Sequence, residues 1–282
     1  MPLPTIDLAF VKQYEAEVHA AYQRQGSKLR GTIRTKNGVR GASTIFQKVG
    51  KGSATQKARH GIIPAMNLDH STVECTLADW YAGEWIDKLD ELKINHDERT
   101  VVVNSEAWAL GRKTDEMIIT ALDSVGSGQN VTGSSDLADS AGLTKAKVLM
   151  AIQMLNEADV PDDGQRFAVV SPGGWTGLMS IAEFASADFI GADLPYRQSM
   201  GTMARSWLGV NWLMHSGLPM DTTYRENFIY HRTAVGHAIG AEVTTDITWH
   251  GDRAAHFVNN MMSQGAVLID GTGVVRIKIT EP

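Results

Sequence analysis

The apolar positions of the chain follow a helical spacing in two long segments. In residues 5–24 and from about residue 97 onward, apolar side chains recur at steps of three and four residues and so share one helix face. The first stripe consists of Leu8, Val11, Val18 and Tyr22, and the second of Val103, Ala107, Leu110, Thr114, Met117 and Ala121. Gly26 and Gly126 follow the two stripes and favour helix ends there. We expect the second helix, about seven turns long, to be a spine for the other elements.

Shorter segments also predict helices. Residues 143–158 carry an apolar face, and Pro172 suits the first turn of a helix that ends near residue 181. We expect the aromatic-rich run 80–86 to be helical as well. Residues 235–240 are expected to form a short helix or a turn.

Runs of β-branched and apolar residues, bounded by glycine and polar clusters, predict strands. These runs are 73–77, 167–170, 207–215, 228–231, 243–249, 254–262, 266–270 and 274–279. With the helices they indicate a mixed α+β fold whose late strands are antiparallel.

Residues 28–61 differ from the rest of the chain. Short β-prone pieces alternate with glycines, and Asn37-Gly38 is a tight-turn signal. With so few apolar residues, this segment is expected to form no core of its own. The sequence therefore predicts an extended two-stranded arm that something other than itself orders.

The same segment carries an unusual charge. Between Lys28 and Arg59 there is no Asp or Glu, whereas residues 60–282 hold 15 basic and 29 acidic residues, a balance of −14. The basic residues are Lys28, Arg30, Arg34, Lys36, Arg40, Lys48, Lys51, Lys57 and Arg59. Three roles are open: a solvated surface loop, a nucleic-acid-binding arm, or a contact with the acidic body of another copy. Phe46 is the only ring in the segment, which disfavours a surface on which bases stack.

Composition narrows the classes further. The chain has 282 residues, of which 43% are hydrophobic, so it can bury a sizeable core. Its single cysteine, Cys75, excludes an internal disulfide framework and is expected to be a small core residue. No run of eighteen apolar residues predicts a membrane span, and the N-terminus lacks the layout of a signal peptide. A reducing cytoplasm is the expected place of synthesis.

Motifs for common enzyme classes are missing from the sequence. There is no phosphate-binding G-x-x-x-x-G-K-[ST] loop and no G-x-S-x-G nucleophile elbow. His231 with His237, and His250 with His256, are six residues apart, a spacing unlike that of zinc ligands. We therefore expect no catalytic residue, no metal site and no cofactor. The tryptophans Trp80, Trp85 and Trp108 are expected to pack in the core.

Several stretches, in their order along the chain, resemble the major capsid proteins of tailed bacteriophages, which share the Hong Kong 97 fold. Residues 109–119 look like the spine-helix segment of these proteins, and residues 167–175 like the strand-proline-helix step of their axial domain. Residues 231–238, 253–265 and 273–277 look like their closing strands. The order of these stretches over nearly the whole chain carries the resemblance.

The resemblance implies a domain organisation. The expected parts are an N-terminal arm (1–30), an extended loop (31–75), a peripheral domain with the spine helix (76–126 and 243–268), and an axial domain (127–242 and 269–282). In this family the arm and loop reach over neighbouring subunits of a hexamer or pentamer. The resemblance thus implies that the basic residues of 28–59 contact another copy.

The implied function is assembly, not catalysis. The resemblance predicts a non-enzymatic virion protein that forms the icosahedral shell around double-stranded DNA and is assembled in the host cytoplasm. Separate scaffolding, portal and decoration proteins are possible partners, and no membrane is expected. Two alternatives stay open from sequence: an encapsulin-like shell of a cellular nanocompartment, and a basic-arm nucleic-acid-binding protein.

Overall fold

The computed structural model describes residues 26–91, 98–133, 135–185, 205–221 and 223–281. The expected helix over residues 5–24 lies outside this part of the chain. The described residues fall into two compact units. The first unit contains residues 80–112 and 243–262, and the second contains residues 27–79, 113–242 and 263–282.

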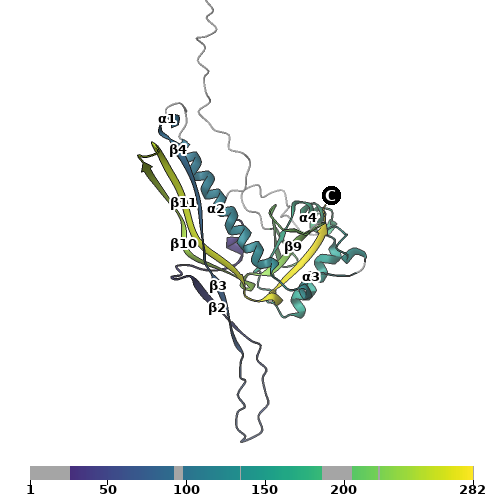
Figure 1. Ribbon diagram of the computed structural model, residues 1–282. Coiled ribbons are helices and arrows are strands. Elements are labelled where there is room, and N and C mark those ends of the chain that lie inside the picture. Colours follow the sequence, from purple (N-terminus) through teal and green to yellow (C-terminus); the bar gives the residue numbers. More distant parts are fainter. Residues whose placement is uncertain (1–25, 92–97, 134, 186–204, 222, 282) are drawn as a thin grey trace, which may run out of the picture. The chain divides into compact units, whose positions relative to one another are not determined.

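The helices and strands are labelled as in Figure 1. The helices are α1 (Lys88–Glu91), α2 (Glu98–Asp123), α3 (Lys145–Glu157), α4 (Pro172–Met179) and α5 (Ala182–Ala185). The strands are β1 (Arg34–Lys36), β2 (Ser43–Val49), β3 (His70–Thr76), β4 (Ala78–Asp87), β5 (Arg166–Val170), β6 (Arg205–Trp207), β7 (Val210–Met214), β8 (Met220–Asp221), β9 (Tyr224–His231), β10 (Val235–His250), β11 (Ala255–Leu268) and β12 (Val274–Thr280). Four of these elements, α2, β4, β10 and β11, pass from one unit into the other. Among the described residues, every helix is too short or too polar to cross a bilayer.

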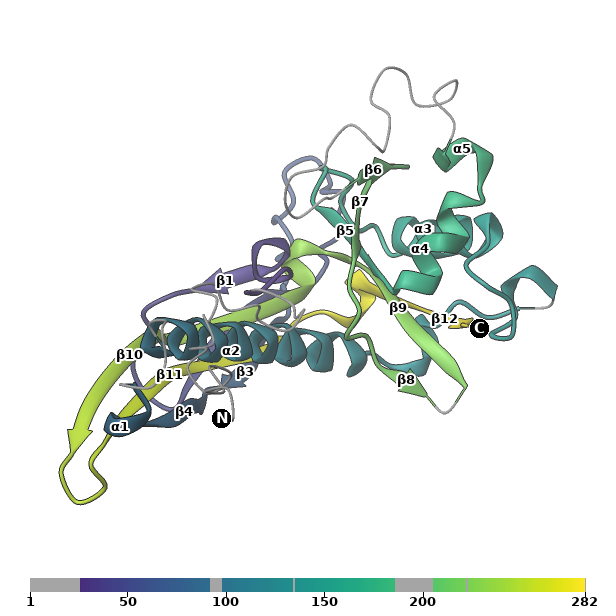
Figure 2. The same cartoon turned by 90° about the horizontal axis from the view of Figure 1, so that it is seen from above.

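The core of the second unit is a sheet with strand order β12-β9-β5-β7-β6. Successive side chains of its central strands point to opposite faces. Ala168 and Val170 of β5 therefore pack with α3 and α4, whereas Val169 between them packs with the C-terminal turns of α2, including Ile118 and Leu122. Figure 2 shows α3 and α4 together on one side of this sheet. Because both faces are covered, most residues of the inner strands β5 and β9 are buried.

In the first unit, the N-terminal part of α2 contacts β11, and Glu106 of α2 lies near Glu84 of β4. Val258, Asn260 and Met262 of β11 are buried at alternate positions. The Asn260 amide donates hydrogen bonds to the Val103 carbonyl at 3.0 Å and to Glu106 Oε2 at 3.1 Å. Burial, together with repulsion from Glu84, raises the pKa of the Glu106 carboxyl.

Three predicted helices are confirmed. The spine helix is α2, and residues 143–158 and 172–181 contain α3 and α4. Pro172 occupies the first turn of α4, and the Ser171 hydroxyl caps it by accepting a hydrogen bond from the Gly174 amide. Pro172 was predicted at this place from the sequence, and the Ser171 cap is an additional finding.

Three predicted elements are wrong in type or extent. Residues 80–86 belong to strand β4, because their aromatic and β-branched side chains suit a pleated surface. Residues 235–240 begin the long strand β10 and do not form a helix or turn. Residues 207–215 are not one strand: Leu208 and Gly209, both at positive φ, form a turn between β6 and β7.

The arm also differs from its prediction. Leu29, Ile33 and Phe46 are buried, so the segment does contribute to the core. Thr32 lies in a short 3-10 helix, and β1 pairs in parallel with β10. Asn37-Gly38 forms a bend and does not join two paired strands. The two-stranded projection consists of β2 and β3 instead.

Candidate assembly surface

The β2–β3 hairpin and its connecting loop form the most exposed part of the second unit. The strands pair antiparallel from Ser43 opposite Thr76 to Val49 opposite His70. The Gly50 amide donates to the Asp69 carbonyl at 2.8 Å and closes the ladder. Residues 51–69 lie within the predicted loop 31–75 and alone are called the extended loop from here on. They are all exposed and contain no helix or strand. Figure 1 shows this loop running out beyond the ends of β2 and β3 and back.

The first basic residues of the predicted site lie in the folded body, not in the loop. The Lys28 backbone amide donates to the Asp115 carboxylate. Arg30 forms an ion pair with Glu242. The Arg34 guanidinium lies 5.7 Å from the centre of the Phe46 ring.

Lys36 on β1 and Lys48 on β2 also have partners in their own chain. Lys36 Nζ donates to the Thr44 hydroxyl at 2.7 Å. Lys48 Nζ lies 2.9 Å from Asp270 Oδ1. Burial alone would raise the pKa of Asp270, but hydrogen bonds from Lys48 and Thr272 hold that pKa below its usual value.

Of the remaining basic residues, Lys51, Lys57 and Arg59 are on the loop and Arg40 precedes β2. Lys51 lies 2.6 Å from Asp159 Oδ2, and its hydrogen bond lowers the pKa of that exposed carboxyl. Arg40, Lys57 and Arg59 are exposed. The structure therefore does not gather the nine basic residues into one patch.

The extended loop carries a feature that the charge analysis missed. Its returning half, residues 61–68, which we call the apolar limb, points large apolar side chains into solvent. Ile62 is 94% exposed, Ile63 76%, Met66 51% and Leu68 37%. Single exposed apolar residues are ordinary, but a run of this kind marks an interaction surface. The signal was the apolar run directly after the basic stretch, which has neither helical nor strand periodicity.

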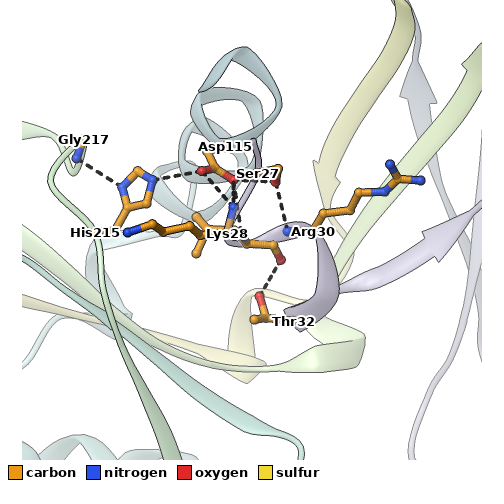
Figure 3. Close-up of polar contacts among 8 residues, drawn as sticks. Ser27, Lys28, Arg30, Thr32, Asp115, His215 and Gly217 are labelled. Carbon is orange, nitrogen blue, oxygen red and sulfur yellow. Dashed lines mark hydrogen bonds and ion pairs between the residues drawn. The ribbon is translucent and has the colours of Figure 1, made fainter. Parts of the chain in front are cut away.

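The root of the basic segment is held by a buried carboxylate. Asp115, on α2, accepts hydrogen bonds from the Ser27 hydroxyl at 2.6 Å and from the amides of Lys28 and Leu29 at 3.1 Å. Its other oxygen lies 3.1 Å from His215 Nε2. Figure 3 shows Asp115 between the residue 27–29 backbone on one side and the imidazole on the other. Asp115 lies within the predicted spine-helix segment 109–119, but no pattern in the sequence indicated its role.

The other residues considered for chemistry lie apart. Cys75 is buried, and burial raises the pKa of its thiol. Among the described residues, no three His, Cys, Asp or Glu side chains gather to hold a metal ion. Trp85 is 40% exposed and does not fill the core as predicted: its ring stacks on Phe257 at 4.6 Å and lies under the Arg253 guanidinium.

The comparisons with known proteins agree on one family and one fold. A sequence profile of the phage capsid protein family matches residues 6–281. The capsid of Ralstonia phage GP4 is 13% identical with a TM-score of 0.73, covering 96% of this chain and 95% of that chain. The capsid of cyanophage P-SCSP1u is 14% identical with a TM-score of 0.72, covering 100% and 96%. A structure from Mycobacterium phage Che8 is 18% identical with a TM-score of 0.71, covering 95% and 96%.

No curated protein matches the chain. The structural likenesses, at such low identity, show that the chain has the fold of phage capsids. The family profile covers nearly all of it, including α2 and the closing strands that carried the resemblance. The chain belongs to the phage capsid protein family and is a major capsid protein of the head shell.

Proposed function

We propose that this protein assembles into hexamers and pentamers in which the extended loop of one subunit lies against the body of the next. The supporting observation is the exposure of the whole loop, with Ile62 and Ile63 directed into solvent. Burying one such side chain in an interface is worth about 1.5–3 kcal/mol. Repeated around a ring, this contribution favours a closed assembly of identical copies.

In this proposal the basic residues act beside the apolar limb. Lys57 and Arg59, on the extended loop, and Arg40, just before β2, are exposed, and they would meet the acidic body of the neighbour. Lys48 and Lys51 lie against carboxylates of their own chain, and an assembly contact by them would exchange one partner for another. Charge complementarity of this kind sets register and association rate more than affinity.

The finer organisation is part of the same proposal. Residues 1–30 would form the N-terminal arm and 31–75 the loop that reaches the neighbour. Residues 76–126 with 243–268 would form the peripheral domain, and the remainder the axial domain. The shell, assembled in the host cytoplasm without enzymatic activity, would enclose double-stranded DNA. Scaffolding, portal and decoration proteins would be separate chains.

The family supports a phage head over a cellular nanocompartment, and enzyme cargo inside purified shells would contradict this choice. It also supports assembly over nucleic-acid binding as the role of the basic segment. Tight, steeply salt-dependent binding of short duplex DNA by single subunits would reverse that preference.

Electron microscopy and size-exclusion chromatography of the expressed protein test the proposal. We expect shells, tubes, or rings of five or six from the wild type. The double variants I62S/I63S and K57E/R59E should stay folded by circular dichroism and fail to assemble. Matched controls are L149S, at an exposed apolar residue of α3, and the charge-conserving K57R/R59K, both of which should assemble.

The outcomes separate the parts of the proposal. A folded wild type that stays monomeric at all salt concentrations would overturn assembly itself. Normal assembly by I62S/I63S would show that the apolar limb is not the contact. Normal assembly by K57E/R59E would remove the electrostatic part alone.

A further inference from the structure

Two buried polar clusters meet at adjacent residues of α2. Asp115 has no exposed surface, and its carboxylate accepts from the root of the basic segment, residues 27–29, and from His215. The Gly217 amide donates to His215 Nδ1 at 3.1 Å, so the proton of the neutral ring lies on Nε2 and points at Asp115. Ser27 in turn accepts from the Arg30 amide. Figure 3 shows this chain of contacts.

The second cluster involves the preceding residue, Thr114. Its hydroxyl donates to Gln264 Oε1 at 3.0 Å, and the same oxygen lies 3.1 Å from His237 Nε2. Gln264 is on β11 and His237 on β10, and both are buried. His237 Nδ1 is buried with no hydrogen-bond partner among the described residues. The ring is therefore neutral, because a proton on Nδ1 would place an unpaired cation in the interior.

We propose that Thr114 and Asp115 form an acid-sensitive latch, which at neutral pH holds the root residues 27–29 and strands β10 and β11 on this part of α2 and which protonation opens. The Asp115 half joins residues 27–29 to α2, and the Thr114 half joins β10 and β11 to the same turn of α2. Opening the Asp115 half frees the root of the basic segment, and opening the His237 half loosens the paired strands. This device is independent of which surface the extended loop contacts.

The charges around both groups give the direction of the effect. Burial lowers the pKa of His237, and the hydrogen bond to Gln264 raises it. The charge of Arg30 lowers this pKa and the charge of Glu242 raises it. The net pKa of His237 lies below its usual 6.5. The unfolded chain then binds this proton more readily. The stabilising contribution of His237 is full above about pH 6.5 and decreases as the pH falls toward the folded pKa.

Asp115 acts in the same direction at lower pH. Burial alone would raise its pKa, but hydrogen bonds from His215, Ser27 and the amides of Lys28 and Leu29 hold it below the usual 3.8. The buried Tyr230 hydroxyl also faces this carboxylate, and the Asp115 charge adds to the effect of burial in raising the pKa of Tyr230. Protonating Asp115 removes the charge on which these hydrogen bonds depend. Weak acid therefore loosens the strands first, and stronger acid releases the root.

Urea unfolding of the full-length protein between pH 7.5 and 5 tests the His237 half. Relative to H237Q, whose side chain stays neutral, the unfolding equilibrium constant of the wild type should increase by up to tenfold per pH unit below about 6.5. H250Q, at a partly exposed histidine at the end of β10, should keep the wild-type profile. Parallel profiles of wild type and H237Q would overturn this half. If H237Q does not fold, an NMR titration midpoint of His237 above 6.5 in the wild type would do the same.

Hydrogen exchange of a peptide covering residues 26–33, corrected for intrinsic rates, tests the Asp115 half. At pH 7, D115N should exchange the protected amides of Lys28 and Leu29 at least tenfold faster than the wild type. The wild type should reach the same rate only below about pH 4. Protection unchanged in D115N, or lost in the wild type above pH 6, would show that Asp115 does not hold the root.

Discussion

The extended loop and the six-stranded sheet of the second unit place their apolar side chains in opposite environments. Trp212, on strand β7 of the sheet, has no exposed surface, whereas Ile62 in the loop is 94% exposed. Trp212 packs among rings of Trp207 and Phe184, and its indole N–H donates to the Trp207 carbonyl at 3.2 Å. The loop has no comparable layer of its own.

The difference shows where each region obtains its free energy. The sheet is stabilised by burial within the chain, so its conformation belongs to the single subunit. The loop leaves its apolar limb in water. It is held to the body mainly by the β2–β3 ladder and by the ion pairs of Lys48 and Lys51. Exposed ion pairs stabilise little. Mutations in the sheet should therefore affect folding, and mutations in the loop should affect assembly.

The largest effect on stability is expected from removing a large side chain from the core beside the sheet. W212A removes a fully buried indole and should reduce the free energy of unfolding by about 3–5 kcal/mol. Urea denaturation followed by tryptophan fluorescence or circular dichroism measures the loss. W249A, at a residue that is 48% exposed, is the matched control and should change stability far less. Equal losses in the two variants would contradict the contrast between core and surface.

A smaller effect is expected from a lysine inside the same core. Lys147 of α3 is fully buried and donates to the carbonyls of Ala141 at 2.8 Å and Lys278 at 2.7 Å. K147M leaves both acceptors without this donor and should reduce the free energy of unfolding by about 1–3 kcal/mol. K145M, at a half-exposed lysine of the same helix, should cost less.

The pH dependence of this effect has a definite sign. Burial lowers the pKa of Lys147 from 10.5 to about 8, with Asp139 opposing the shift, so between these values the unfolded chain binds more protons. The wild type should therefore gain stability as the pH rises from 8 to 10.5, a gain that K147M lacks. Urea denaturation at pH 7.5 and 9.5 compares the two. A K147M profile parallel to that of the wild type would mean that Lys147 ionises as in water.

The spacing of apolar residues predicted those helices and strands in which one face is buried along the whole element. The apolar stripe of α2 and Pro172 at the start of α4 are local signals, and both were confirmed. The first part of β10, residues 235–240, was not predicted as strand because Gly236 and Gly240 resemble turn residues. Their reason is steric: a Cβ at Gly236 would lie 2.8 Å from the Phe46 ring, and one at Gly240 would lie 2.7 Å from Leu77. Neighbours so distant in sequence could not be inferred.

The candidate surface was predicted only in part for the same reason. An acid-free basic segment is visible in the sequence, but its ion pairs with Glu242, Asp159 and Asp270 join residues more than a hundred positions apart. Charge counting treated these lysines and arginines as equivalent. The apolar limb escaped because it has no period, and a period is what sequence reading detects.

The smallest effect on folding is expected from substitutions in the apolar limb. The same substitutions should have a large effect on assembly. In a single subunit, I62S/I63S removes side chains that contact mostly water, so the free energy of unfolding should change by less than about 0.5 kcal/mol. Hydrogen exchange of residues 61–68 should be unprotected in wild-type subunits and protected in assembled particles. Protection already present in the monomer would mean that the loop is ordered by its own chain. The sheet and the loop would then differ in degree of burial alone, and not in whether one copy or several determine their conformation.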